Sequence, residues 1–252
     1  MSDIDLYLGD CLEVMKDFKD ESIDFIICDL PYGTTQNNWD CCIDLDKLWK
    51  EYKRIIKPHG CIALFAQSPF DKVLACSNLK MFRYEWIIEK TRATGHLNAK
   101  KMPMKAHENI LIFYKKLPTY HPQMTHGHTR KVSTAEHKKN CKATTNYGNH
   151  GLTTYDSTDR YPRDVLTFSW DTQKSSIHPT QKPVALLEYM INTYTNEGDL
   201  VLDNCMGSGT TGVACKKLNR DFIGIELEEY YFCEAKKRIT LESEEHGYEN
   251  NK

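Results

Sequence analysis

Several common features are missing from this sequence of 252 residues. No apolar run approaches the roughly 20 residues that a membrane-spanning helix needs. The segment Met1–Asp5 is acidic and has no apolar core, unlike a secretory signal peptide. No two of the ten cysteines have the Cys-x-x-Cys spacing of a metal clip, and no internal repeat is visible. These absences predict a soluble intracellular protein without a membrane anchor.

The cysteines do not indicate disulfides either. Cys28, Cys61 and Cys205 lie in or beside apolar runs, where a reduced thiol packs as a small apolar side chain. The histidines at 121, 126 and 128 have no cysteine partners at ligand spacing, so no metal site is expected. With 40% hydrophobic residues, the chain can build one sizeable α/β core and a small appended lobe.

An excess of positive charge is also missing, because the formal net charge is −2, which by itself argues against a nucleic-acid-binding protein. The distribution of charge reverses this impression. Between Lys80 and Tyr147 fourteen Lys or Arg stand against four Asp or Glu, a local balance of +10. Positive charge gathered in one segment is typical of phosphate binding. A solvated surface loop is the alternative.

The first and last thirds of the sequence alternate between predicted strands and helices. Buried strands are expected near 22–28, 61–66, 200–202 and 222–225, and helices near 45–56, 69–79, 183–194, 210–218 and 228–241. Lys57–Gly60 is expected to end a helix, and 84–89 and 109–114 to form an antiparallel edge pair. Residues 117–176 break the pattern. We therefore predict a doubly wound, mostly parallel α/β sheet with a basic insert.

The segment Asp29-Leu30-Pro31-Tyr32 directly follows the mostly apolar run 23–28. A carboxylate, a rigid proline and an aromatic ring at the mouth of a buried strand can hold a planar amine. Tyr32 can stack on a flat heterocycle and Asp29 can accept hydrogens from an exocyclic amine, while Pro31 fixes the backbone. A strand-end cap for Asp29 and simple packing for Tyr32 are the alternatives.

A second pattern lies far down the chain. The apolar run 200–202 leads to Asp203, then to the loop Gly207-Ser208-Gly209 and a predicted helix from Thr210. Glycines let a ligand approach the backbone closely, and the helix N-terminus offers unpaired N–H groups. About 20 residues later, Glu226 ends the next predicted strand, where a carboxylate can bind both hydroxyls of a ribose.

Two cofactors fit this second pattern, a dinucleotide and S-adenosylmethionine. Gly207-x-Gly209-x-x-Gly212 satisfies the dinucleotide fingerprint, but such triplets are common. Asp203 favours S-adenosylmethionine, because a carboxylate there suits the cationic amino group of a methionine and is poorly placed beside a pyrophosphate. A tight turn without a ligand is the remaining alternative.

Taken together and in this order, the two motifs resemble those of the amino-directed DNA methyltransferases, specifically the permuted β class. In that family an Asp/Asn/Ser-Pro-Pro-Tyr/Phe motif comes first, a target-recognition region follows, and the Asp-x-x-x-Gly-x-Gly loop comes last. Gly9–Glu13 and His178–Pro183 are supporting matches. Leu30 replaces the usual first proline, and Asn204-Cys205 the usual Pro-Phe after the loop acid.

The resemblance implies a reaction on an amine of DNA, which requires the base to leave the stack. Tyr32 would stack on the flipped base, and Asp29 and the Leu30 carbonyl would accept the two amine hydrogens. Methyl transfer is then an in-line displacement that depends mainly on positioning. The implied catalytic residues are Asp29, Leu30, Pro31 and Tyr32.

The resemblance also implies a cofactor site, with Asp10 near the adenine, Glu226 near the ribose and Asp203 at the methionine amino group. A helix cap is a second role open to Asp10. The expected cofactor-binding residues are Asp10, Cys11, Thr180, Lys182, Asp203, Cys205, Gly207, Ser208, Gly209, Thr210 and Glu226. The expected DNA-binding residues are Trp39, Lys100, Lys101, Lys105, Arg130 and Lys131.

Three functional divisions are expected: a catalytic half over 1–94, a target-recognition insert over 95–176 and a cofactor-binding half over 177–252. Adenine N6 is favoured over cytosine N4, because Asp at the first motif position goes more often with adenine. A nicotinamide-dependent oxidoreductase and a catalytically idle DNA-binding protein are alternatives from other classes. Double-stranded DNA, a homodimer and a cognate restriction nuclease are the expected partners, in the cytoplasm of a bacterium or a phage-infected cell.

Overall fold

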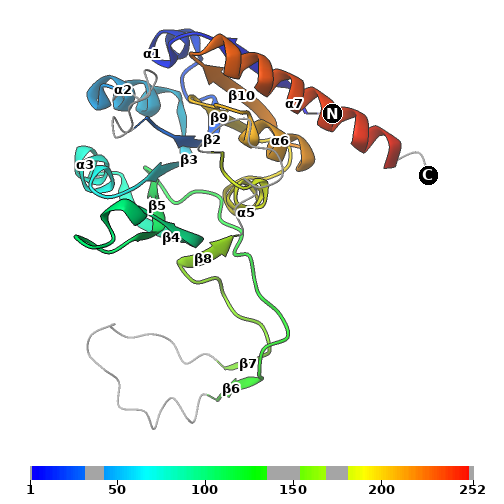
Figure 1. Ribbon diagram of the computed structural model, residues 1–252. Helices are drawn as coiled ribbons and strands as arrows, with labels where there is room; N and C mark the ends of the chain where they lie inside the picture. Colours follow the sequence, from blue (N-terminus) through cyan, green and yellow to red (C-terminus); the bar gives the residue numbers. More distant parts are fainter. Residues whose placement is uncertain (1, 32–42, 135–153, 169–180, 250–252) are drawn as a thin grey trace. The chain divides into compact units, whose positions relative to one another are not determined.

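The computed structural model describes residues 2–31, 43–134, 154–168 and 181–249. Within these residues, one sheet has the strand order β1-β10-β9-β2-β3-β5-β4-β8 (Figure 1). Its strands are β1 (Ile4–Leu8), β2 (Ile23–Asp29), β3 (Ile56–Ala66), β4 (Phe82–Thr94), β5 (Lys105–Phe113), β8 (Val165–Phe168), β9 (Leu200–Asp203) and β10 (Asp221–Glu226). The helices are α1 (Cys11–Val14), η1 (Met15–Asp17), α2 (Leu45–Ile55), α3 (Phe70–Ser77), η2 (His96–Asn98), α5 (Val184–Tyr194), α6 (Thr210–Lys217) and α7 (Glu229–Glu249).

The order of the strands contains a point at which the direction of winding reverses. Strands β1, β10, β9, β2 and β3 are parallel, whereas β5 is antiparallel to both β3 and β4. The chain runs from β9 through α6 to β10 on one side, and from β2 through α2 to β3 on the other. The boundary between β9 and β2 is therefore the topological switch point, where open α/β sheets bind their ligands.

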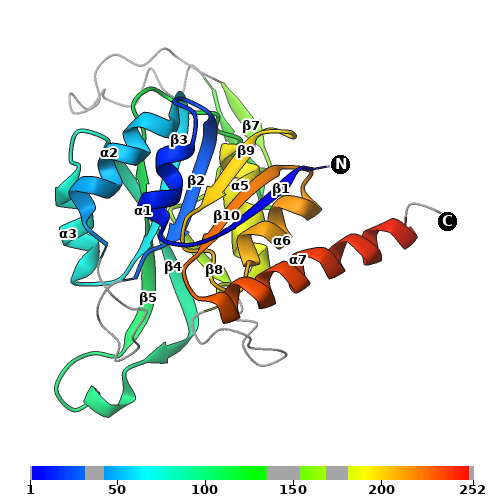
Figure 2. The ribbon, with the colours of Figure 1, turned by 90° about the horizontal axis from the view of Figure 1, so that it is seen from above.

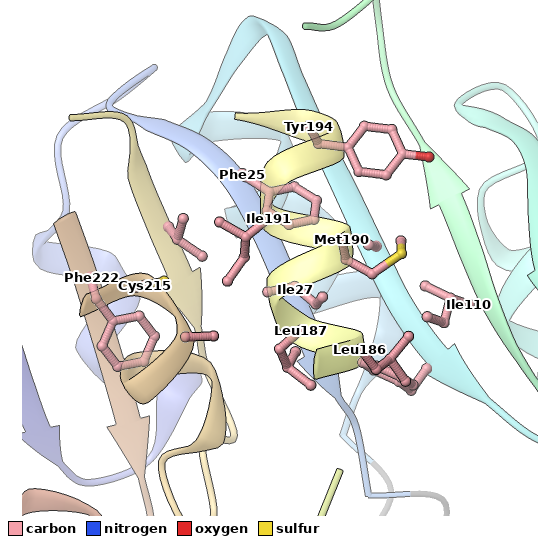
Figure 3. Close-up of a cluster of buried hydrophobic side chains, with 14 of the residues drawn as sticks. Phe25, Ile27, Ile110, Leu186, Leu187, Met190, Ile191, Tyr194, Cys215 and Phe222 are labelled. Atoms are coloured by element: carbon pink, nitrogen blue, oxygen red, sulfur yellow. The ribbon is translucent and has the colours of Figure 1, made fainter. Parts of the chain in front are cut away.

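Helices cover both faces of the sheet, which confirms the predicted doubly wound architecture (Figures 1 and 2). Along β2, Phe25 and Ile27 pack into the cluster beneath α5 and α6, whereas Ile26 and Cys28 pack into the cluster beneath α1 and α2. Figure 3 shows the first of these clusters. A strand buried on both faces needs apolar side chains at every position, which explains the continuous apolar run. Each fully buried large side chain of this kind contributes about 1.5–3 kcal/mol.

Helix α2 ends at Ile55, as expected just before Lys57–Gly60. The expected start of the next strand at Cys61 is wrong, because β3 begins at Ile56 and contains Lys57–Gly60. The register of the β2–β3 pairing shows how Lys57–Gly60 fit into the strand. Ile56 pairs with Ile23 but Cys61 pairs with Phe25, so 57–60 form a bulge outside the regular ladder with β2. A proline without an N–H is tolerated at such a bulge. Gly60 is required there, because a Cβ would lie 2.8 Å from the Asp24 carbonyl oxygen.

The antiparallel pair β4–β5 was expected at the edge of the sheet, but β8 pairs with β4 and takes the edge position. Both strands also extend further than the sequence pattern suggests. The added residues 91–94 and 105–107 are exposed and mostly polar, so they lack the apolar alternation that marks a strand. The closing helix α7 likewise continues to Glu249 rather than ending near Leu241.

The chain has two compact units, 1–121 with 164–252, and 122–163. The second unit contains the antiparallel pair β6 (Lys131–Ser133) and β7 (Tyr155–Ser157). The expected division into 1–94, 95–176 and 177–252 concerns roles and stays a prediction. Among the described residues, no helix is both long and apolar enough to cross a bilayer.

Candidate active site

Carboxylates stand at the carboxyl ends of adjacent strands around the switch point. Asp29, Asp203 and Glu226 are the last residues of β2, β9 and β10, and Asp10 follows β1. The order β1-β10-β9-β2 therefore sets Asp10, Glu226, Asp203 and Asp29 in a row. Four strands at the usual spacing span about 14 Å. Such a row can bind an elongated ligand that carries several N–H, O–H or cationic groups.

Asp203 is buried at the centre of this row, with 5% of its surface exposed. Its carboxylate accepts hydrogen bonds from the Thr211 hydroxyl at 2.6 Å and the Cys205 N–H at 3.2 Å. Burial raises the pKa of Asp203 to about 7, against these hydrogen bonds, and the charge of nearby Asp29 adds to the rise. A carboxylate held in this way gains most from a cationic partner, which restores its charged form.

Glu226 connects the end of β10 to the glycine loop. Its carboxylate accepts hydrogen bonds from the N–H groups of Gly207 at 2.8 Å and Glu228 at 2.9 Å. Burial raises the pKa of Glu226, while these backbone N–H groups oppose the rise. A carboxylate has about four lone-pair sites, so acceptor capacity remains for the hydroxyls of a ligand.

The glycine loop is fixed from behind by α7. Gly207 and Gly209 have φ values of +51° and +73°, which favour glycine. A Cβ on Gly209 would lie 2.9 Å from the Ala235 Cβ of α7. Arg238 Nη1 donates to the Thr210 hydroxyl at 2.9 Å and to the Ser208 carbonyl at 3.2 Å. Sequence reasoning missed Arg238, because nothing in its local pattern separates it from other cations of α7.

Asp10 caps α1, since its carboxylate accepts the Leu12 N–H at 2.7 Å. The preceding Gly9 N–H donates to the Glu226 carbonyl at 2.9 Å, which holds the ends of β1 and β10 together. The helix-cap role considered for Asp10 is therefore present. Asp10 is exposed, so its carboxylate is also accessible to a ligand.

The thiol of Cys205 interacts with the thiols of both Cys11 and Cys28. The bond to Cys205 and burial raise the pKa of Cys11, and burial raises that of Cys28 to about 12. These two thiols therefore stay protonated and are poor nucleophiles.

Asn204, where the family has proline, is buried and accepts a hydrogen bond of 2.5 Å from the Tyr52 hydroxyl of α2. Tyr52 thus satisfies the side-chain oxygen that this departure from the family pattern brings into the interior.

Asp29 lies at the end of a chain of alternating charges. Lys182 Nζ is 2.5 Å from Asp29 Oδ2 and 3.6 Å from Glu108 Oε2. Lys90 Nζ lies 3.8 Å from the same Glu108 oxygen. Burial alone would lower the pKa of Lys182, but Asp29 and Glu108 raise it well above its usual value. Lys182 therefore remains a cation and directs its charge at Asp29.

Glu108 is the member of this chain of charges that the sequence did not indicate. Its side chain is 6% exposed, and its Oε1 atom has no hydrogen-bond partner within the described part of the chain. A buried carboxylate between two lysines is costly unless the geometry is good. Such buried charges are more common at functional sites, so the position of Glu108 next to Asp29 supports a functional site here. The sequence around Glu108 indicates only an apolar strand. Its ion-pair partners come from β4 and from the segment before α5, which are distant in sequence, so the local pattern could not reveal them.

The remaining expected catalytic residues are only partly described. Leu30 is 3% exposed and Pro31 is partly buried directly after Asp29. Tyr32, Trp39 and Thr180 lie outside the described residues.

The expected DNA-binding cations fall into both units. Lys100, Lys101 and Lys105 are exposed on the β4–β5 hairpin, and Lys105 Nζ lies 3.3 Å from Gln67 Oε1. Arg130 and Lys131 belong to the second unit, where Arg130 donates to both carboxylate oxygens of Asp156 at 2.7 and 2.6 Å.

The histidines considered for zinc have other partners. His126 Nδ1 lies 2.9 Å from Asp159, and His128 lies 2.7 Å from the Thr125 hydroxyl. Over the described residues, no group of three or more His, Cys, Asp or Glu is arranged to hold a metal ion.

The donor set fits S-adenosylmethionine. Asp203 offers a buried carboxylate for an ammonium, Glu226 retains acceptor capacity for ribose hydroxyls, and Asp10 can accept from an adenine amine. The row ends at Asp29, next to the place where a methyl acceptor would lie.

Comparison with known proteins identifies the family of this chain. The family model described as DNA methylase (N6_N4_Mtase) matches residues 23–237. The chain is 31% identical to the Type II methyltransferase M.HpaI of Haemophilus parainfluenzae, over 97% of this chain and 76% of the relative. It is 28% identical to the DNA adenine methyltransferase YhdJ of Escherichia coli, over 93% and 82% respectively. Among solved structures, the M1.HpyAVI–SAM complex is similar with a TM-score of 0.62 and 28% identity, covering 93% of this chain and 99% of the other.

Proposed function

Because this chain belongs to the DNA methylase family, whose members are S-adenosylmethionine-dependent DNA methyltransferases, we propose that it methylates the exocyclic N6 amine of an adenine in duplex DNA. The observation that carries the proposal is the adjacency of β9 and β2 at the switch point. It sets the loop acid Asp203 beside Asp29, although 174 residues of sequence separate them.

The row of carboxylates gives each part of the cofactor a partner. Asp10 accepts from the adenine amine, Glu226 binds the ribose hydroxyls and Asp203 pairs with the methionine ammonium. The bound cofactor supplies an electrophilic methyl group on a sulfonium. The site around it is shaped by Cys11, Cys205, Ser208, Thr210 and the two loop glycines, and Thr180 is a further cofactor-binding residue.

The amine is prepared by the residues after β2. Asp29 and the Leu30 carbonyl accept its two hydrogens, which directs the nitrogen lone pair toward the methyl group. Pro31 fixes this turn, and Tyr32 stacks on the flipped base. Lys182 holds Asp29 in place through the 2.5 Å contact, in addition to the expected contact with the cofactor.

Two considerations support adenine over cytosine. Asp at position 29 goes with adenine more often than with cytosine in families of this resemblance, and the E. coli relative is named a DNA adenine methyltransferase. The family model covers both N6 and N4 methylases, so cytosine N4 is the second candidate. The oxidoreductase alternative is set aside, because membership of a DNA methylase family does not accommodate it.

DNA binding extends beyond the catalytic pocket in this proposal. Trp39 and the cations at 100, 101, 105, 130 and 131 contact the duplex, and the insert over 95–176 selects the sequence. The Type II names of the relatives support a partner restriction nuclease that cuts the unmethylated site. A homodimer in the bacterial cytoplasm, where genomic DNA is accessible, completes the proposal.

The test is sequencing with modification detection on DNA from cells that express this chain. We expect N6-methyladenine in one sequence context. N4-methylcytosine in that context would show that the target base is cytosine and not adenine. Unmodified DNA would overturn the proposal.

Cells that express Asp29→Ala are the control, and their DNA should be unmodified. The purified variant should bind S-adenosylmethionine nearly as well as the wild type, because Asp29 acts on the amine. Loss of both binding and transfer would mean that the variant is misfolded or that the assignment of Asp29 is wrong.

A further inference from the structure

The end of the β4–β5 hairpin, residues 91–107, is exposed along its whole length. Every residue from Thr91 to His107 is exposed, while Glu108 and the residues that follow it in β5 are buried. Figure 2 shows the hairpin extending beyond the neighbouring strands. The four strand residues after Lys90 give it a length of about 13 Å before the turn at Gly95. Its base is fixed at the active site, because Lys90 and Glu108 belong to the charge chain that ends at Asp29.

The charge of the hairpin is of one sign. Residues 91–107 contain Arg92, Lys100, Lys101 and Lys105 and no acid, within a chain whose net charge is −2. This composition suits a polyanion and disfavours a second hairpin of the same charge as the partner. Duplex DNA is the polyanion that the active site already requires.

The turn of the hairpin carries three exposed apolar side chains among its polar residues. Leu97 lies in the turn η2 and is 87% exposed, and Met102 and Met104, further along the same turn, are 53% and 40% exposed. An apolar side chain that is exposed to water is unfavourable and is stabilised when a partner covers it. The cations of the hairpin attract nucleic acid, which would bring Leu97 to the DNA. Both grooves of B-DNA are about 7.5–8.5 Å deep, so an arm of about 13 Å can bring its tip to the base stack.

We propose that Leu97 is a wedge that enters the duplex and fills the space left by the flipped target base. Pulling a base out of the stack costs a few kcal/mol and leaves an apolar gap, and inserted apolar side chains are known to occupy such gaps. Lys100 and Lys101 hold the hairpin on the phosphates while Leu97 is inserted. This inference rests on the proposed function, since it concerns the same target base.

The test compares Leu97→Ala with the wild type on two oligonucleotide duplexes that carry the mapped methylation site. In one, the target base is paired; in the other, it faces an abasic position, so it is already partly unstacked. We expect the single-turnover rate of Leu97→Ala to fall about 10- to 100-fold on the paired duplex, which corresponds to a few kcal/mol of unstacking. On the abasic duplex, the rate should stay within about threefold of the wild type.

Leu79→Ala is the matched control. Leu79 is 64% exposed and lies before β4, at the end of that strand opposite to the hairpin. This variant should match the wild type on both duplexes, and Leu97→Met should recover most of the lost rate. Thermal unfolding and S-adenosylmethionine binding should be unchanged in all three variants.

A normal rate of Leu97→Ala on the paired duplex would overturn the wedge, and so would an equal loss on both duplexes. Either result leaves the proposed function intact as long as the wild type methylates the site. A wild type that methylates neither duplex would instead remove the proposed function.

Discussion

Lys182, from the segment before α5, donates a hydrogen bond of 2.5 Å to Asp29, the last residue of β2. The same ammonium faces Glu108 at 3.6 Å, so one buried cation holds two carboxylates from different strands. The orientation of the Asp29 carboxylate therefore depends on residues far from its own motif. Catalysis that relies on positioning is sensitive to such a contact.

Replacing Lys182 by Met should reduce both activity and stability. Asp29 loses the donor that fixes it, and Glu108 loses one of its two cations in a buried position. We expect the methyl-transfer rate to fall about 100-fold and the free energy of unfolding to fall by about 3 kcal/mol. Single-turnover kinetics and urea denaturation measure the two effects.

The double variant Lys182→Met with Glu108→Gln separates these effects. It should recover most of the stability, because Glu108→Gln removes the excess negative charge that Lys182→Met leaves among Asp29, Glu108 and Lys90, while the rate stays low. A rate restored by Glu108→Gln, or a normal rate of Lys182→Met, would contradict the role of Lys182 in positioning Asp29. A loss confined to cofactor affinity would assign Lys182 to the cofactor alone.

The affinity for S-adenosylmethionine should depend on the protonation of Asp203. Its pKa of about 7 means that the carboxyl is mostly neutral at lower pH, and a neutral carboxyl cannot pair with an ammonium. We expect the association constant to rise up to about tenfold per pH unit below pH 7 and then to level off. Calorimetric titration across this range tests it, with Asp203→Asn as a weak-binding control that lacks the slope.

The same group should make the stability of the cofactor-free protein fall with rising pH. The pKa of Asp203 is raised from 3.8 to about 7 on folding, so the folded state binds the proton more tightly than the unfolded state. Its stabilising contribution is complete below the unfolded value and is lost as the pH rises through 7. The slope is at most about 1.4 kcal/mol per pH unit.

Urea denaturation of the wild type and of Asp203→Asn at several pH values isolates this contribution. The difference between their free energies of unfolding should shrink up to pH 7 and stay constant above it. A difference that stays constant between pH 5 and pH 8 would mean that Asp203 is ionised in the folded protein throughout this range.

Two glycines with similar backbone angles should respond differently to substitution. Gly198 and Gly209 have φ values of +79° and +73°, but a Cβ on Gly198 meets nothing within 4 Å, whereas one on Gly209 meets Ala235 at 2.9 Å. Gly198→Ala should destabilise the fold by about 1 kcal/mol through backbone strain alone. Gly209→Ala should cost about 1–3 kcal/mol more through overpacking against α7.

Only Gly209→Ala should also weaken S-adenosylmethionine binding, because it displaces the loop beside Asp203. Thermal unfolding and calorimetric titration of both variants provide the comparison. Equal losses of stability and equal cofactor affinities in the two variants would show that the loop and Ala235 can move apart without loss of stability.

Much of this architecture could be read from local patterns. The continuous apolar run at 23–28 and the strand–glycine–helix pattern at 200–218 mark elements whose burial the chain cannot avoid. Membership of the DNA methylase family confirms the class of enzyme that these motifs indicated. The bulge at 57–60 and the long exposed ends of β4 and β5 were not readable, because their stabilising partners come from other strands.

The sequence by itself determined which residues are candidates for the chemistry, because a carboxylate before a proline and an aromatic ring, or before a glycine loop, has few other uses. Only the tertiary structure decided how these groups are arranged. Strand pairing sets Asp10, Glu226, Asp203 and Asp29 side by side, and it brings Lys182 and Glu108 to the last of them. Such contacts join residues that are distant along the chain, so the free energy that fixes them arises only when the sheet is assembled.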